Sequence, residues 1–238
     1  MEIKLSERLY RIAKLLRPGT IFADIGSDHA YLPCYVCLQD KNSLAIAGEV
    51  AEGPYNRARQ TVEQYELTDQ IDVRLGNGLE VIRKSDSVYE VVIAGMGGSL
   101  ISTILTKGKD QLRQVERLII QPNNNERKVR ETLRKLGFIL TEEYILEENG
   151  IIYEIFVACR KDVTNQSDPY IEENLSKQLL FGPYLMKEKS SIFIKKWTSE
   201  KQKLKQTIDQ MSKSSQSHIR DKINRFKKRL QWIEEVLS

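Results

Sequence analysis

Acidic residues and glycines stand in this chain where chemistry with a nucleotide-like ligand would need them. An apolar run ends in Asp24-Ile25-Gly26-Ser27-Asp28 and leads into a helical pattern. Gly26 permits a tight turn, and a helix start offers free N–H groups to such a ligand. The dinucleotide fingerprint G-x-G-x-x-G is not met, because Asp28 and Tyr31 occupy its second and third glycine positions. Two carboxylates would repel a pyrophosphate but suit the ammonium group of S-adenosylmethionine.

Three more strand-like runs end in residues suited to the same ligand. The second run ends in Gly48-Glu49-Val50, where a carboxylate can accept both ribose hydroxyls. Gly76-Asn77-Gly78 follows the third run and can wrap an adenine edge, and the fourth ends in the glycine-rich run 94–98, which leaves backbone accessible. The predicted cofactor-binding residues are Asp24, Gly26, Ser27, Glu49, Val50, Asn77, Gly78, Ala94, Gly95 and Met96.

The elements that must position these residues alternate along the first 160 residues. A leading helix is indicated by Leu5, Leu9, Ile12, Ala13 and Leu16 at 3.6-residue spacing. Strands are predicted at Thr20–Ile25, Leu44–Val50, Ile71–Leu75, Tyr89–Ala94 and Leu118–Gln121. Helices are predicted at Tyr31–Gln39, Pro54–Tyr65, Gly98–Thr106 and Glu126–Leu136. This alternation indicates βαβ units and a mostly parallel sheet, hence an α/β fold.

The alternation ends in two consecutive strand-like runs, Phe138–Leu146 and Ile151–Cys159. The Asn149-Gly150 turn signal between them predicts a hairpin, so the sheet should finish with an antiparallel pair. A seven-stranded, Rossmann-like methyltransferase sheet ends in this way, whereas an NAD-type sheet has no need of the hairpin.

The character of the chain changes after residues 161–167, which are polar. Two heptad-like segments, Ile194 to Met211 and Ile219 to Leu237, flank a Ser-rich stretch at 212–217 and predict an antiparallel, coiled-coil helical hairpin. Between Lys187 and Arg229 there are 14 basic residues and four acidic ones. We therefore expect a domain at residues 1–162 and a basic helical domain at 168–238. The second domain is either a tRNA-binding arm or an ordinary solvated helical surface.

Several of these motifs together resemble one family. They are Asp24 to Pro33, Gly53-Pro54, Gly76-Asn77-Gly78, Ile93 to Gly98 and Gln121-Pro122-Asn123. The set is similar to the bacterial tRNA adenine-22 N1-methyltransferases, strongly up to about residue 160 and through the helical tail. The resemblance implies a class I methyltransferase core, S-adenosylmethionine as donor and N1 of a tRNA adenosine as acceptor, with a C-terminal coiled-coil domain.

The acceptor side departs from the pattern of many adenine N-methyltransferases, which place Asn/Asp-Pro-Pro-Tyr/Phe after the fourth strand. Ala-Gly-Met-Gly-Gly stands there instead, so base recognition is expected from carbonyls of residues 94–96 and from nearby side chains. The predicted catalytic residues are Asp28, His29 and Tyr31, although Asp28 could instead cap a helix. Predicted substrate contacts are Gly97, Gly98, Asn123, Lys195, Lys196, Lys203, Arg220, Lys227 and Lys228.

Composition excludes several other classes. No run of 18 apolar residues would cross a membrane, and the charged N-terminus has no signal core, so we expect a cytoplasmic protein. Three cysteines make no disulfide framework; Cys34 and Cys37 lie in an apolar helical pattern and read as buried thiols, so no metal site is expected. The alternatives left open are a methyltransferase for another RNA or a small amine, an NAD-type Rossmann protein, and a non-catalytic RNA-binding module. The oligomeric state is left open as well.

Overall fold

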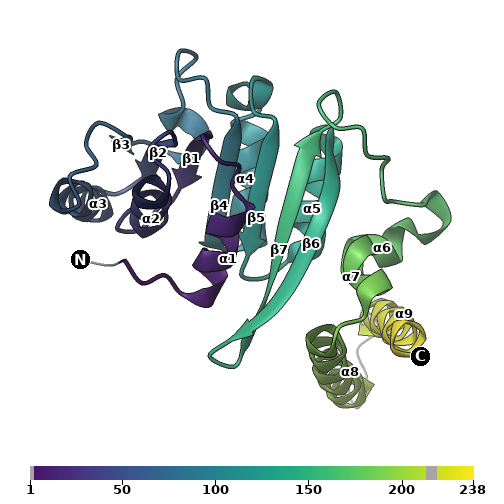
Figure 1. Cartoon of the computed structure of the whole chain (residues 1–238). Coiled ribbons are helices and arrows are strands. Elements are labelled where there is room, and N and C mark those ends of the chain that lie inside the picture. The colour runs from purple at the N-terminus through teal and green to yellow at the C-terminus, as the bar shows by residue number, and fades with distance from the viewer. Residues whose placement is uncertain (1–2, 213–218) are drawn as a thin grey trace. The chain divides into compact units, whose positions relative to one another are not determined.

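The computed structural model describes residues 3–212 and 219–238 (Figure 1). The chain divides into two compact units, residues 1–169 and 170–238. No helix within the described ranges is long and apolar enough to cross a membrane.

The first unit is built on a sheet of seven strands in the order β3-β2-β1-β4-β5-β7-β6. The strands are β1 (Ile21–Ile25), β2 (Leu44–Glu49), β3 (Ile71–Leu75), β4 (Glu90–Met96), β5 (Arg117–Pro122), β6 (Phe138–Glu148) and β7 (Ile151–Arg160). The first five strands pair in parallel, and β7 runs antiparallel to both β5 and β6. The predicted fold class is confirmed, terminal hairpin included.

Helices cover both faces of this sheet. The helices α1 (Glu7–Leu15), α2 (Tyr31–Gln39) and α3 (Glu52–Gln64) lie on one face, and α4 (Gly98–Lys107) and α5 (Glu126–Lys135) on the other (Figure 1). Short 3₁₀ turns follow β3 (Gly78–Val81) and α4 (Gln111–Arg113). Each helix after a strand starts at the carboxyl end of that strand, so this edge of the sheet collects the helix starts and the loops.

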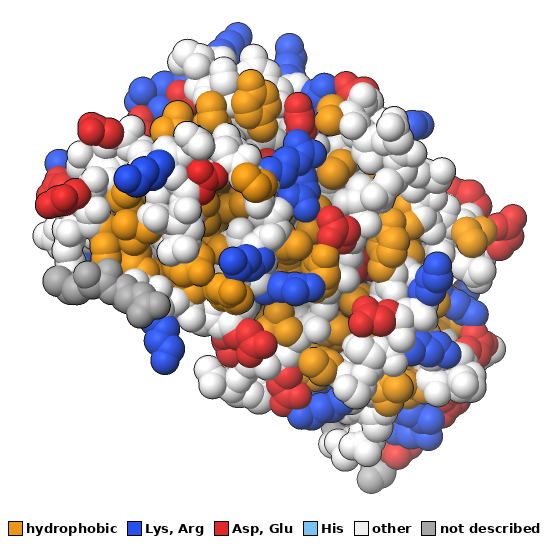
Figure 2. Space-filling view, in the orientation of Figure 1, with side chains coloured by type: hydrophobic (Ala, Val, Ile, Leu, Met, Phe, Trp, Pro, Cys, Tyr) orange, Lys and Arg blue, Asp and Glu red, His pale blue; other side chains and the backbone are white. Residues whose placement is uncertain are grey.

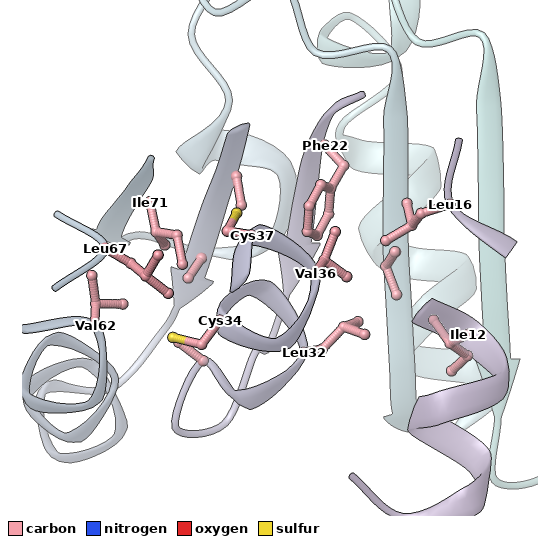
Figure 3. Close-up of a cluster of buried hydrophobic side chains, with 14 of the residues drawn as sticks. Ile12, Leu16, Phe22, Leu32, Cys34, Val36, Cys37, Val62, Leu67 and Ile71 are labelled. Atoms are coloured by element: carbon pink, nitrogen blue, oxygen red, sulfur yellow. The ribbon is translucent and has the colours of Figure 1, made fainter. Parts of the chain in front are cut away.

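A buried cluster joins α1, α2 and α3 to the sheet. It includes Ile12 of α1, Leu32 of α2, Val62 of α3 and Phe22 of β1 (Figure 3). Cys34 and Cys37 lie in this cluster, and burial raises the pKa of both thiols to about 12. The prediction of buried cysteines is confirmed. Thiols this hard to ionise are poor nucleophiles and metal ligands.

The second unit is helical throughout its described part. A 3₁₀ turn (Glu172–Asn174) precedes α6 (Leu175–Phe181) and α7 (Pro183–Glu188), which the heptad pattern does not predict because each is at most two turns long. The long helices α8 (Ser191–Ser212) and α9 (Ile219–Leu237) pack against each other. The predicted Ser-rich turn falls largely outside the described residues.

The buried face of α8 departs from the predicted seam at its beginning. Phe193 is fully buried and meets Trp197, whereas the predicted Ile194 is half exposed. Lys201 is tolerated in the seam because its ammonium group lies 3.2 Å from the Glu234 carboxylate. A lysine stem can pack on apolar neighbours while its charged end reaches solvent or an acid.

Candidate functional site: the carboxyl edge of the sheet

The predicted cofactor residues come together because the parallel register places their strand ends side by side. Ile25 of β1 pairs with Gly48 of β2 and with Ile93 of β4, and Glu49 of β2 pairs with Leu75 of β3. We call the ends of β1, β2 and β3 with their loops the donor half of this edge. The ends of β4 and β5 with their loops form the acceptor half.

Two buried carboxylates define the donor half. Asp24, at the end of β1, accepts a 2.6 Å hydrogen bond from the Ser27 hydroxyl. Glu49, at the end of β2, accepts the backbone N–H of Asp28. Desolvation raises the pKa of Asp24 to about 7, against the lowering effect of the Ser27 hydrogen bond, and desolvation raises the pKa of Glu49 as well. A hydrogen-bonding or cationic ligand would therefore stabilise the ionised form of both carboxylates.

The loop between β1 and α2 is held in a strained backbone conformation. Gly26 has φ +73°, and Asp28, His29 and Ala30 all have positive φ, which is costly for residues with a side chain. Such strain persists where the surrounding structure imposes it, and it concentrates at ligand sites. Ala30, not Asp28, precedes α2 and gives it no side-chain cap, so the helix-cap reading of Asp28 is wrong.

The three predicted catalytic residues lie on this loop and on the first turn of α2. The Asp28 side chain is 78 % exposed, and its carboxylate lies 3.6 Å from His29 Nε2. The rings of His29 and Tyr31 stack with centroids 5.3 Å apart. The loop therefore presents a carboxylate and a stacked aromatic pair beside the carboxylates of the donor half.

Of the remaining predicted cofactor residues, Val50, Asn77 and Gly78 lie in the same half, whereas Ala94, Gly95 and Met96 belong to β4 in the acceptor half. Val50 and Leu75 expose apolar side chains at neighbouring strand ends, at 69 % and 50 %. Asn77 is exposed in the next loop, and Gly78 has φ +59° with Ile104 packed against it. Met96 reaches over from β4, because a Cβ on Gly26 would stand 2.1 Å from its terminal methyl group. An exposed apolar strip beside an amide fits a flat heterocycle such as adenine.

The acceptor half is organised around a bulge at Gly95, where the β4–β5 register shifts. Gly95 has φ +76°, its N–H donates to Gln121 Oε1 at 3.0 Å, and its carbonyl accepts from Asn123 Nδ2 at 2.7 Å. The Met96 carbonyl accepts the backbone N–H of Asn123 at 2.8 Å. Of the carbonyls at 94–96 expected to recognise the base, those of Gly95 and Met96 thus already accept hydrogen bonds from Asn123. Asn123 therefore holds this loop in place as well as being a candidate contact.

Gly97 and Gly98 fit the acceptor half by their small size. A Cβ on Gly98 would stand 2.5 Å from the Asn124 carbonyl oxygen and 2.7 Å from that of Asn125. The Gly98 N–H donates to the same Asn124 carbonyl at 3.0 Å. Gly97 meets only the end of the Asn124 side chain, at 3.3 Å. Close packing against the backbone of Asn124 and Asn125 explains why a glycine stands at position 98, and its substrate contact stays a prediction.

Sequence reasoning missed Arg8 and Gln121 as site residues. Gln121 is fully buried, and its side-chain oxygen accepts from Arg8 Nη1 as well as from Gly95. Arg8 Nη1 also lies 3.6 Å from where a Gly95 Cβ would stand, while its Nε is buried with no hydrogen-bond partner among the described residues. A polar residue that closes an apolar strand is a signal that could have singled out Gln121. The pattern of the leading helix gives no such signal for Arg8.

The predicted RNA contacts of the second unit lie on α8 and α9. Lys195, Lys203, Arg220, Lys227 and Lys228 are exposed, and Lys196 is half-buried with its ammonium group 5.6 Å from the centre of the Trp197 ring. Lys203 lies 3.0 Å from Glu200, and Lys205 lies 3.3 Å from Glu234. Part of the positive charge of this segment is therefore offset by acids within the same unit.

Comparison with known proteins identifies the family of this chain. The family model described as tRNA (adenine(22)-N(1))-methyltransferase matches residues 22–235. A Bacillus subtilis protein named tRNA (adenine(22)-N(1))-methyltransferase is 44 % identical over 238 residues, all of this chain and 98 % of that protein. The chain belongs to this family. The resemblance inferred from the sequence motifs is confirmed.

Solved structures agree with this membership in the tRNA (adenine(22)-N(1))-methyltransferase family. The crystal structure of the Bacillus subtilis m1A22 tRNA methyltransferase TrmK has a TM-score of 0.91 at 43 % identity, covering 100 % of both chains. A Streptococcus pneumoniae protein in complex with S-adenosyl-L-methionine has a TM-score of 0.84 at 39 % identity, covering 99 % of this chain and 100 % of that one. The similarity spans both units.

Proposed function

We propose that this protein transfers the methyl group of S-adenosylmethionine to N1 of adenosine 22 in tRNA. Family membership supports the reaction, and one observation in the site carries it: the buried carboxylates of Asp24 and Glu49 stand at adjacent strand ends. A tRNA substrate also favours the cytoplasmic location expected from the sequence.

The donor half fits S-adenosylmethionine, which supplies an activated methyl group on a sulfonium. Asp24, with its raised pKa and a single hydroxyl partner in the donor half, suits the ammonium group of the ligand. Glu49 suits the ribose hydroxyls, because one carboxylate can accept both. Val50, Leu75 and Asn77 would hold the adenine ring by apolar contact and an amide hydrogen bond. NAD fits less well, because its pyrophosphate would face these carboxylates.

The proposed methyl transfer to adenine N1 depends little on a general base. Adenine N1 carries an in-plane lone pair, so the protein mainly aligns that nitrogen with the methyl group and the sulfur. Methylation leaves the base cationic, and the exposed carboxylate of Asp28 stabilises that charge as it develops. His29 and Tyr31 offer a stacked face to the base. N1 lies on the Watson–Crick edge, so the adenosine must be unpaired or turned out of its stack.

The helical unit is proposed as an electrostatic arm for tRNA. The exposed basic residues of α8 and α9 would neutralise phosphates and release counterions, and log affinity then falls linearly with log salt. Neutralising about four phosphates gives a slope of roughly −3 to −4. The competing view makes α8 and α9 a purely structural hairpin.

The decisive experiment incubates the full-length protein with total tRNA and labelled S-adenosylmethionine, followed by mass-spectrometric mapping. We expect one N1-methyladenosine, at position 22, and much less label with Asp24→Asn at subsaturating donor, because that variant loses the charge facing the ammonium group. Label in a different RNA, or tight binding of NAD in calorimetry, would refute the assignment.

A charge-reversal variant tests the arm. Lys195, Lys196, Lys227 and Lys228 are changed to glutamate, which replaces no apolar seam residue, and thermal unfolding checks that loss of the Lys196 contact with the Trp197 ring leaves the unit folded. The proposal expects weaker tRNA binding, a flatter salt dependence and unchanged donor affinity. Unchanged tRNA binding and salt slope would leave the arm structural.

A further inference from the structure

The helix α1 carries a basic surface that the site described above does not use. Between Lys4 and Arg17 the chain has five basic residues and one acidic residue, Glu7. The apolar face of the helix is buried through Ile12, and Leu16 is buried just beyond the helix end, so Arg11 and Lys14 are turned outward and exposed. The net charge of this segment, +4, equals that of the whole chain.

Aromatic rings interleave with these charges. Tyr10 is 44 % exposed, its ring centre lies 5.3 Å from Lys14 Nζ, and its ring meets Tyr35 of α2 edge-on at 6.0 Å. Tyr31, one turn before Tyr35 on α2, is equally exposed. Figure 2 shows basic side chains among apolar ones over the region that α1 and α2 occupy in Figure 1. Aromatic faces beside cationic side chains are the surface chemistry that binds unpaired nucleotides.

This surface adjoins the acceptor half of the site. The same helix carries Arg8, whose guanidinium group bonds to Gln121 next to Gly95. The helix begins at this edge and ends near the opposite one, where the Arg17 N–H donates to Glu90 at the start of β4 at 3.0 Å. A chain of nucleotides lying along α1 therefore leads to the loop that receives the acceptor base.

Two acidic residues of the β6–β7 hairpin next to α1 bond to groups other than the Arg11 and Lys14 side chains. Glu142 accepts the Tyr144 hydroxyl and lies 3.3 Å from Arg117, and Glu148 accepts the backbone N–H of Arg8 at 3.2 Å. The guanidinium carbon of Arg11 lies 4.2 Å from the centre of the Tyr144 ring. That stacked arrangement holds the Arg11 side chain in place while its charge stays available to a phosphate.

We propose that Tyr10, Arg11, Lys14, Tyr31 and Tyr35 form a second RNA-binding surface, which holds the nucleotides that flank the target adenosine. Arg11 and Lys14 bind their phosphates, and Tyr10 stacks on an unpaired base. The inference rests on the proposed tRNA substrate. It goes beyond the basic arm, because it places RNA contacts on the methyltransferase unit itself, next to the chemistry. An adenosine held out of its pair needs such support for its neighbours.

The first test removes the two charges in the full-length protein with Arg11→Gln and Lys14→Gln together. We measure binding of an unmodified tRNA transcript against salt, KM for tRNA, kcat and the dissociation constant for S-adenosylmethionine. Losing two phosphate contacts should reduce the salt slope by about 1.4–1.8 and raise KM for tRNA. The kcat at saturating tRNA and the donor affinity should stay at parental values.

A matched control removes the same charge elsewhere. Lys107→Gln and Lys109→Gln neutralise two exposed lysines at and just after the end of α4, and this variant should keep the parental slope and KM. Tyr10→Ala should raise KM for tRNA about fivefold or more, whereas Tyr10→Phe, which keeps the ring, should not. Parental donor affinity in each variant reports that the unit is folded.

The outcomes separate two failures. If the parent methylates tRNA but the Arg11/Lys14 variant keeps the parental KM and salt slope, the α1 surface is refuted and the proposed function stands. If the control pair flattens the slope equally, the effect is one of net charge and the surface is again refuted. If the parent itself methylates no tRNA, the proposed function fails first.

Discussion

The donor and acceptor halves of the sheet edge differ in the kinds of residue that form them. The donor half relies on buried carboxylates whose pKa values are raised because burial desolvates them. The acceptor half relies on neutral amides and glycines, and the polar groups of Gly95 and Asn123 satisfy one another. The donor half therefore favours a cationic ligand, whereas hydrogen bonds within the protein already fix the conformation of the acceptor half.

The difference follows from the charges of the two ligands. S-adenosylmethionine brings an ammonium group, so a desolvated carboxylate gains on binding. Adenine is neutral until it is methylated, so a charged pocket would gain little from it in the ground state. A fixed backbone that orients the base contributes more to the rate than one that must reorganise. Four variants and conditions test this contrast, from the largest expected effect to the smallest.

Glu49→Ala should break the donor half alone. The lost carboxylate is a charge-assisted acceptor worth about 1.5–3 kcal/mol, so the dissociation constant for S-adenosylmethionine should rise roughly 10–150-fold. Calorimetry measures it, and kcat at saturating donor should change little. Glu49→Gln keeps an acceptor for the Asp28 N–H and should lose less. Parental affinity in Glu49→Ala would refute the ribose assignment.

Gly98→Ala should disturb the acceptor half through packing. Its Cβ would stand 2.5 Å from the Asn124 carbonyl oxygen, and forcing the loops apart should cost about 1–3 kcal/mol of stability. Gly97→Ala is the matched control, because it meets only a movable side-chain end at 3.3 Å. Denaturant unfolding of the two variants compares them directly. Equal stability of both would show that the loops yield easily.

Lowering the pH should weaken the donor half. Asp24 has a pKa of about 7 in the free protein, raised by desolvation from 3.8, so it is largely protonated at pH 6. The ammonium group favours the carboxylate, so binding releases a proton below pH 7. Affinity should then rise up to tenfold per pH unit, about 1.4 kcal/mol, until pH 7 and level off above it. Asp24→Asn should flatten this dependence in calorimetry, and an unchanged profile would assign it to another group.

The raised pKa of Asp24 changes the stability of the free protein in the opposite direction to the donor affinity. Between pH 4 and 7 the unfolded chain ionises Asp24 while the free native protein keeps it protonated, so the native state loses stability as the pH rises through this window. Bound S-adenosylmethionine should remove most of this loss. Thermal unfolding with and without the donor across the window measures both.

Arg8→Met should give the smallest effect and sharpen the acceptor half. Removing one hydrogen bond to Gln121 leaves Gly95 still bonded to that side chain, so about 0.5–1.5 kcal/mol is lost and kcat falls roughly 2–10-fold. Donor affinity should not move, and amide exchange at Gly95 should quicken. Arg11→Met, on the next turn, is the control for exchange and kcat. Parental kcat and exchange in Arg8→Met would mean that Gln121 holds the loop unaided.

Most of the edge could be predicted because it depends on short-range patterns. The strands alternate with helices, so Asp24, Glu49, Asn77 and the Gly95 run had to end on one edge once the sheet was parallel. The roles of these residues remain predictions. Heptad spacing likewise predicted α8 and α9, but it chose Ile194 where Phe193 is buried. The two residues are adjacent, and only the folded unit shows which of them is buried.

The sequence by itself determined the fold class, the family and which residues stand at the end of each successive strand, because periodicity, turn residues and motifs are local. Only the tertiary structure decided that Arg8 reaches Gln121, 113 positions away, and that Asn123 already holds the Gly95 carbonyl. It also decided how far Asp24 is desolvated. These contacts depend on how α1 packs across the sheet and how the β4–β5 register shifts at Gly95. No local pattern encodes such geometry, because it arises only when distant segments bury their apolar faces together.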